Sequence, residues 1–183
     1  RLEWVKGYEY RLRAGQLLSE RGGPFEYRII GDGAYLEPLA FARHEMGLEA
    51  DVQFLGSRSH SDVLEQMGWA DVFLHASVSE GFCNAVLEAQ AMRLPVVASN
   101  ADGLTENIAD GHTGFVVPRR DPAALADRLA DLAGDPALRR RMGQAGRERV
   151  KTCFPLPQQI AAFDRFYREM VASRACGSDL DSN

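Results

Sequence analysis

Short runs of apolar and β-branched residues alternate along the chain with segments whose apolar residues recur at helical spacing. The apolar runs predict strands at residues 25–30, 52–55, 72–74, 96–98 and 115–117. Helical spacing is seen at Tyr10, Ala14, Leu17 and Leu18. Further helices are predicted at about residues 35–46 and 62–67, and from the turn at residues 79–82 to about Arg93. Strands that alternate with helices form right-handed βαβ units, so we expect an α/β fold with a doubly wound, Rossmann-like parallel sheet.

The last third of the chain is predicted to be helical. Asp121-Pro122 and Asp135-Pro136 each place a capping acid before a proline, which is typical of a helix start. A further helix is lined by Ile160, Phe163, Tyr167 and Met170. From residue 173 the sequence becomes small, polar and acidic. We therefore expect one domain over residues 1–172 and a disordered tail over residues 173–183.

The segment at residues 79–89 is the strongest candidate for chemistry, because it follows a predicted strand and opens a helix. Ligands of parallel sheets bind beyond the carboxyl ends of the strands. Glu80 lies on the turn, while Glu88 lies about a turn and a half inside an otherwise apolar helix. Gly81 allows close backbone approach, and the N–H groups of residues 82–85 are predicted to be unpaired donors. The alternative is that Glu80 caps the helix and Glu88 is a solvated surface acid.

Composition excludes several classes of protein. The net charge of −5 provides no broad positive surface for nucleic acid. The widely spaced Cys83, Cys153 and Cys176 fit neither a disulfide framework nor a zinc site, and they suit a reducing cytosol. No apolar stretch approaches membrane-spanning length. His75 ends a predicted strand, and we weigh ligand contact and packing equally for it.

Several blocks of sequence follow one another in a recognisable order along the chain. Glu80 and Glu88 stand in the spacing Glu-x7-Glu and are followed by Ala-Met-x-x-Pro-Val-Val-Ala-Ser at residues 91–99. Further blocks lie at residues 1–7, 29–33, 52–56, 103–106 and 111–115. Together, and in this order, these blocks resemble glycosyltransferase family 4, whose members are retaining enzymes of GT-B fold. The resemblance covers Arg1 to about Tyr167. It implies the C-terminal, nucleotide-sugar-binding half of a GT-B enzyme, with the acceptor-binding half upstream of Arg1.

The resemblance also implies roles for individual residues. Arg1 and Lys6 would hold the donor diphosphate, and Glu88 would bind the ribose hydroxyls. Contacts to the donor sugar would come from Glu80, Gly81, Phe82, Cys83 and Asn84. Gly103 and Leu104 would lie near the phosphates, and Gly56, Ser57 and Arg58 near the base. Asp102 is a departure, because the family often has glycine there, and a carboxylate beside a diphosphate is unfavourable unless it points away.

The implied reaction is transfer of a hexosyl group from a UDP-, GDP- or ADP-sugar to a hydroxyl, with retention of configuration. No Asp-x-Asp metal clamp follows a predicted strand, so we expect neither a metal nor a cofactor. The acceptor would be a sugar or a lipid-linked sugar, in cell-envelope or exopolysaccharide synthesis. We expect a cytoplasmic protein, with peripheral contact to the inner face of the membrane as a minor alternative for the basic residues Arg139, Arg140, Arg141, Arg147 and Arg149.

Because only Arg1-Leu2 of the first strand is present, we expect a sheet that is gapped or re-paired. A chain of this kind would be inactive alone and only marginally stable. Two other functions stay open. A nicotinamide-dependent dehydrogenase half is disfavoured because the third glycine position after Gly31-Asp32-Gly33 is Leu36. A non-catalytic nucleotide-binding module would not need two acids and two cations at one sheet edge.

Overall fold

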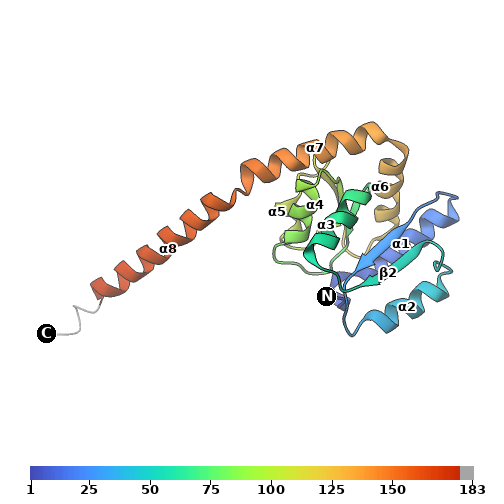
Figure 1. Ribbon diagram of the computed structural model, residues 1–183, viewed down its shortest axis with the longest axis horizontal. Helices are drawn as coiled ribbons and strands as arrows, with labels where there is room; N and C mark the ends of the chain where they lie inside the picture. The colour runs from blue at the N-terminus through green and yellow to red at the C-terminus, as the bar shows by residue number, and fades with distance from the viewer. Residues whose placement is uncertain (178–183) are drawn as a thin grey trace. The chain divides into compact units, whose positions relative to one another are not determined.

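The computed structural model describes residues 1–177, with side chains described as far as residue 171. Strands and helices alternate along the chain as the sequence predicts (Figure 1). The strands are β1 Tyr27–Ile30, β2 Val52–Gly56, β3 Phe73–His75, β4 Val96–Ser99 and β5 Gly114–Val117. The helices are η1 Trp4–Lys6, α1 Tyr8–Glu20, α2 Leu36–Glu45, α3 His60–Trp69, α4 Asn84–Ala91, α5 Leu104–Asn107, α6 Pro122–Gly134, α7 Pro136–Cys153 and α8 Leu156–Gly177.

The strands are all parallel, but they form two sheets among the described residues. β1 pairs with β2, and the second sheet has the order β3-β4-β5. The expectation of a parallel α/β fold is confirmed. Within residues 1–177 the strands do not form one continuous sheet, since β1 and β3 belong to different sheets. Of the two expected outcomes, the gapped sheet is found.

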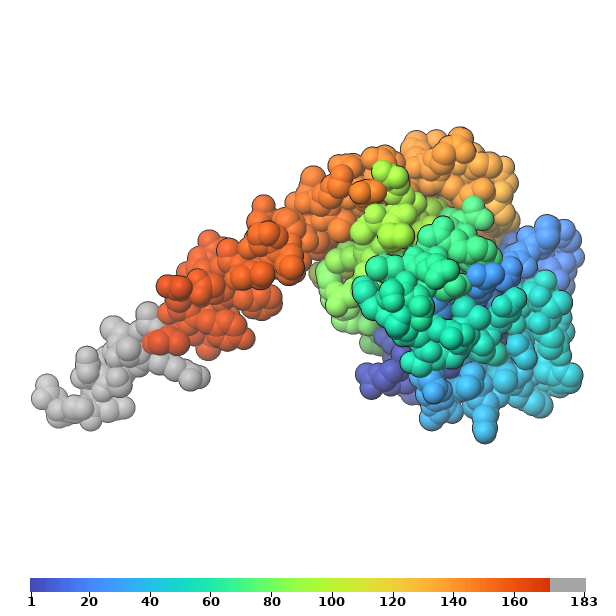
Figure 2. Space-filling model, viewed as in Figure 1, coloured from blue at the N-terminus to red at the C-terminus, as the bar shows by residue number. Residues whose placement is uncertain are grey.

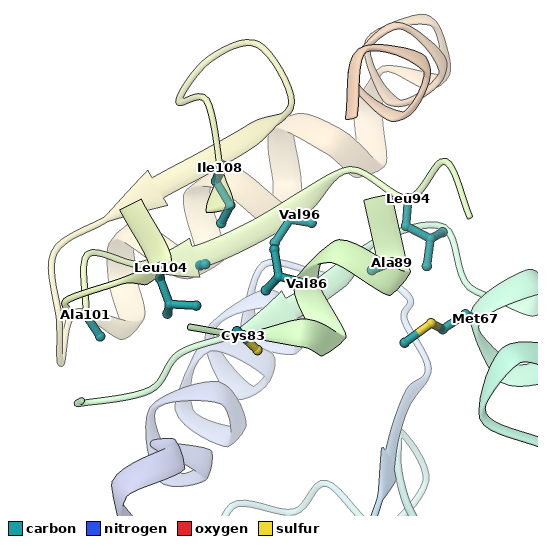
Figure 3. Packing of buried hydrophobic residues seen from close by; sticks show 10 residues of the cluster. Met67, Cys83, Val86, Ala89, Leu94, Val96, Ala101, Leu104 and Ile108 are labelled. Atoms are coloured by element: carbon teal, nitrogen blue, oxygen red, sulfur yellow. The ribbon is translucent and has the colours of Figure 1, made fainter. Parts of the chain in front are cut away.

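Strand β4 is the centre of the larger sheet. All four of its residues are buried, as expected for a strand covered by helices on both faces. Val96 and Ala98 pack into one cluster with residues of α4 and α5 (Figure 3). Val97, on the opposite face, packs with residues of α1 and α6. This three-layer packing fixes the carboxyl ends of β3, β4 and β5, where the candidate site lies.

Some local structure differs from the sequence prediction. Helix α3 begins two residues earlier than predicted, because Ser59 and Asp62 form a capping box. Strand β3 is displaced by one residue to Phe73–His75. The short η1 and α5 were not predicted, because a single helical turn carries no periodic pattern.

The chain divides into two compact units, Arg1–Glu148 and the residues from Arg149 onward. In the second unit, α8 continues to Gly177, so residues 173–177 are helical where a disordered tail was expected. Residues 178–183 of that tail lie outside the described residues. Exposed large apolar side chains on α8 (orange to red in Figure 2) are Leu156, Ile160, Phe163, Phe166, Tyr167, Met170 and Val171. None of the helices, within the residues described, combines the length and apolar character needed to cross a membrane.

Candidate functional site

A lysine near the start of the first unit and a glutamate near the middle of its sequence meet beside the end of β3. Lys6 is the last residue of η1, and its Nζ donates to Glu80 Oε2 at 2.7 Å. Gly7 follows with φ 63°, and a Cβ there would lie 2.0 Å from the Ala76 carbonyl oxygen. Only glycine therefore permits this close approach of the η1–α1 turn to the chain just after β3. The sequence Lys6-Gly7 thus places a cation at the carboxyl end of the sheet.

The Glu80 carboxylate is held at one of its two oxygens. Besides Lys6, Ser77 Oγ donates to Oε2 at 3.2 Å, and His75 Nε2 lies 3.1 Å from the same atom. The hydrogen bond from His75, with the Lys6 ammonium second, lowers the pKa of Glu80 to about 2. Within the part of the chain whose side chains are described, these contacts all end on Oε2. Oε1 of a fixed, ionised carboxylate is therefore left as an acceptor for a hydroxyl.

His75 is a buried neutral histidine. Burial lowers its pKa to about 4, against the opposing effect of its hydrogen bond to Glu80. A proton on Nε2 lets the neutral ring donate to the carboxylate, while Ser77 Oγ and Cys83 Sγ lie 3.0 and 3.6 Å from the same nitrogen. Burial also raises the pKa of the Cys83 thiol, so Cys83 does not offer an activated nucleophile.

One set of side chains here has the composition of a metal site. The ligand atoms of His75, Glu80 and Cys83 lie within 4.8 Å of one another. The Lys6 ammonium, however, already places a positive charge 2.7 Å from Glu80 Oε2, the oxygen that His75 also contacts. A cation at that position opposes a second one, so we assign these residues to a hydrogen-bond network.

The depressed pKa of His75 predicts sensitivity to acid. Its pKa is 6.5 as an ordinary value and about 4 in the fold, so below pH 6.5 the unfolded chain gains this proton first. The contribution of neutral His75 to the free energy of unfolding is therefore fully present above pH 6.5. It is lost progressively as the pH falls to about 4. This loss is on the order of 3 kcal/mol. In the complete protein, His75→Gln is expected to flatten the fall in melting temperature between about pH 6.5 and 4.

The exposed His112 provides the matched control for that measurement. His112→Gln should leave the pH dependence of the melting temperature as it is in the parent protein. Equal slopes in the parent and in His75→Gln would contradict the assignment of a buried neutral histidine.

The loops after β3 and β4 are joined at the Glu80 turn. Ser79 Oγ donates to Asp102 Oδ2 at 2.7 Å, and the Glu80 N–H donates to the same oxygen at 3.3 Å. The Gly103 N–H donates to the Glu80 carbonyl oxygen at 2.9 Å. A Cβ on Gly103 would lie 1.4 Å from the Gly81 carbonyl oxygen, so only glycine fits. The Asp102 carboxylate therefore points toward residues 79 and 80.

The start of α4 differs from the sequence prediction. Cys83 precedes the helix, and its N–H donates to the Asn107 side-chain oxygen at 3.1 Å. The expectation that the N–H groups of residues 82–85 are all unpaired is therefore wrong at Cys83. The reason is tertiary: α5, a helix that no pattern predicts, brings the buried Asn107 to this position.

A cavity of about 790 Å³ adjoins this network. Residues of β1 and β3 line it, and so do Arg1, Lys6, Cys83 and Glu88. Glu88 is half-buried on α4. Within the described part of the chain, its carboxylate forms no hydrogen bond or ion pair, although the sequence led us to expect a partner. Lys6 and Glu88, from segments 82 residues apart in sequence, thus face one cavity.

Comparisons with known proteins identify the family of this chain. The family model described as "Glycosyl transferases group 1" matches residues 1–149. The chain belongs to this family. Among curated relatives, D-inositol 3-phosphate glycosyltransferase of Corynebacterium glutamicum is 31% identical over 94% of this chain and 43% of its own. The amylovoran biosynthesis glycosyltransferase AmsK of Erwinia amylovora is 34% identical over 84% of this chain and 39% of its own.

Solved structures of glycosyltransferases share the fold of this group 1 domain. HepE of Anabaena, crystallised with UDP and glucose, superposes with a TM-score of 0.81 and 26% identity, over 89% of this chain and 45% of its own. The expected GT-B, Rossmann-like fold is confirmed. The chain spans less than half the length of each of these three proteins.

Several residues expected at the site of this group 1 domain lie apart from the Lys6–Glu80 pair. Arg1 lines the cavity, but its side chain is 84% exposed and pairs with Glu3. Arg58, just past Gly56 and Ser57 at the end of β2, lines a separate cavity of about 440 Å³. Leu104 is fully buried in the core, so its side chain is a packing residue. Gly81, Phe82 and Asn84 are exposed around the turn.

Sequence reasoning missed two residues of the candidate site, Ser77 and Arg119, and gave ligand contact and packing equal weight for His75. Ser77 and His75 both contact Glu80. Arg119 reaches Asp102 Oδ1 at 3.4 Å from the loop after β5. Its position two residues past a predicted strand was the signal that could have found it, because strand ends of a parallel sheet share one edge.

Proposed function

We propose that this chain is the nucleotide-sugar-binding half of a retaining glycosyltransferase. The observation that carries the proposal is the Glu80 carboxylate, ionised and held through Oε2 by Lys6, Ser77 and His75. Two of these partners, Lys6 and His75, line one cavity together with Glu88. A fixed acceptor for a sugar hydroxyl and a second acid for a ribose are the groups that a sugar nucleotide requires. The bound UDP and glucose of HepE support the same substrate class.

In the proposed reaction a hexosyl group passes from a nucleoside diphosphate sugar to a hydroxyl acceptor with retention. Lys6 and Arg1 would stabilise negative charge on the leaving diphosphate, which is the main contribution a protein makes to such a step. Glu80 Oε1 would accept a hydrogen bond from the donor sugar, and Glu88 would bind the ribose. Two protein cations at the diphosphate make a metal unnecessary for charge stabilisation, so we propose a metal-independent transfer.

The wider setting rests on relatives and on the family resemblance. AmsK is named for amylovoran biosynthesis, which supports a polysaccharide or cell-envelope pathway with a sugar or lipid-linked acceptor. We propose that a further domain binds that acceptor and that this chain alone does not transfer sugar. A cytoplasmic location with peripheral membrane contact is part of the same proposal.

Ligand-dependent thermal shifts of the complete protein test the substrate class. UDP, GDP or ADP is expected to stabilise the folded protein by about 1 kcal/mol or more at concentrations several times the Kd, with no effect from NAD. The same shift is expected in EDTA, and so is sugar transfer. Stabilisation by NAD alone would favour a dehydrogenase half, and nucleotide binding without turnover on any donor would favour a non-catalytic binding module. Loss of turnover in EDTA would remove the metal-independent mechanism.

A further inference from the structure

The carboxylate of Asp102 joins three loops at the carboxyl edge of the β3-β4-β5 sheet. Oδ2 accepts hydrogen bonds from Ser79 Oγ at 2.7 Å and from the Glu80 N–H at 3.3 Å, both in the loop after β3. Oδ1 lies 3.4 Å from the Arg119 guanidinium, in the loop after β5. The hydrogen bond from Ser79 is the main cause that lowers the pKa of Asp102, so the carboxylate is ionised at neutral pH.

Arg119 is itself fixed from two directions. Its backbone N–H donates to Asn100 Oδ1 at 2.9 Å, and its guanidinium donates to the Val78 carbonyl oxygen at 3.2 Å. Asp102 has a backbone φ of 33°, which few residues other than glycine adopt but which aspartate tolerates better than most. The loops that follow β3, β4 and β5 are therefore linked by polar contacts that converge on Asp102.

An ordinary surface ion pair does not explain this arrangement. The Asp102 and Arg119 side chains are each nearly half exposed, and such pairs add little to the stability of a fold. The two hydrogen bonds on Oδ2 instead fix the backbone of the turn that carries Glu80. Lys6, Ser77 and His75 hold the Glu80 carboxylate, whereas Asp102 holds the peptide from which this side chain departs.

We propose that Asp102 is a positioning residue for Glu80, acting through the Ser79–Asp102–Arg119 contacts, which we call the turn clamp. This proposal rests on the proposed function for its kinetic consequence. The clamp keeps residues 79–81 in the one conformation that directs Glu80 Oε1 at the donor sugar. The Asp102 side chain thus orders the turn through hydrogen bonds to Ser79 and Glu80, which a glycine at this position could not form.

Kinetics of the complete protein test the clamp. Asp102→Ala is expected to lower kcat about tenfold and to change the donor KM by less than about threefold, because misplacement of a reacting group affects turnover more than nucleotide binding. Asp102→Asn keeps an acceptor oxygen and should restore most of kcat. Ser79→Ala should lower kcat by less, and Ser79→Ala with Asp102→Ala should be no worse than Asp102→Ala, since both variants remove the same hydrogen bond.

Asp110 offers a matched control. It is an exposed aspartate whose Oδ1 also accepts a backbone N–H, that of Val116 at 2.8 Å, and among the described residues it forms no hydrogen bond or ion pair with residues 79–81. Asp110→Ala should leave kcat unchanged. Additive effects of the Ser79 and Asp102 variants, or an equal loss of kcat in Asp110→Ala, would overturn the proposal.

Amide hydrogen exchange separates the clamp from the proposed function. In Asp102→Ala the Glu80 amide is expected to exchange about tenfold faster, with Val116 unchanged, and Asp110→Ala should give the reverse pattern. If no nucleotide sugar supports turnover, the proposed function fails, while the exchange result still decides the clamp. An unaltered Glu80 amide in Asp102→Ala would overturn the clamp whatever the kinetics show.

Discussion

Glu80→Ala in the complete protein is expected to lower kcat about a hundred- to a thousandfold and to change the Kd for a nucleoside diphosphate by less than about threefold. The two effects separate because the free oxygen of Glu80 is placed for the sugar, which a nucleoside diphosphate lacks. Oε2 is engaged by Lys6, Ser77 and His75, so the carboxylate cannot turn away when the donor binds. Steady-state kinetics and nucleotide titration of the same preparation measure both quantities.

Two companion variants make this test specific. Glu80→Gln keeps the side-chain length and removes the charge, so it should lie between the parent and Glu80→Ala in kcat. Glu45→Ala removes an exposed acid at the end of α2 and should change neither quantity. Parallel losses of turnover and nucleotide affinity in Glu80→Ala would show that Glu80 binds the nucleotide. Unchanged turnover would remove Glu80 from the site.

The strands and their order along the chain could be predicted because their signals are local. The apolar run at residues 96–98 predicted a strand, and its lack of alternation reflects burial on both faces in β4. The parallel arrangement followed from the alternation of strands with helices. The same reasoning placed Glu80 at the carboxyl edge of the sheet, because it follows a strand directly.

The contacts within the site could not be predicted, because they join residues distant in sequence. Lys6 and Glu80 are 74 residues apart, and only the family resemblance paired them with one ligand. His75 and Ser77 become partners of Glu80 through the bend after β3, which no periodic pattern describes. Asn107 lies on a helix of four residues, and its hydrogen bond to the Cys83 N–H removed a donor that the sequence left unpaired.

The prediction of a disordered tail from residue 173 failed over residues 173–177 for a different reason, namely that composition was used in place of helix propensity. Small and polar residues were taken to predict disorder from residue 173. That segment, however, contains alanine and arginine, which favour helix, and it has no glycine or proline before Gly177. Helix α8 therefore continues to Gly177.

Glu88→Ala is expected to weaken binding of a nucleoside diphosphate about 30- to 150-fold, or about 2–3 kcal/mol, with a smaller effect on kcat at saturating donor. Glu88 lies on α4 with its carboxylate half-buried, beside the cavity that Lys6 also lines. A carboxylate in this setting can accept hydrogen bonds from both ribose hydroxyls. Its removal leaves those hydroxyls without partners while they are shielded from water.

Discrimination between ribose and deoxyribose identifies the group that Glu88 binds. The parent protein should bind a nucleoside diphosphate more tightly than its 2′-deoxy analogue, and Glu88→Ala should lose most of that difference, because the missing hydroxyl and the missing carboxylate belong to one interaction. Glu80→Ala should keep it, since Glu80 is assigned to the sugar. If Glu88→Ala still prefers ribose to the full extent, Glu88 is a solvated acid at the cavity edge and the ribose is bound by other residues.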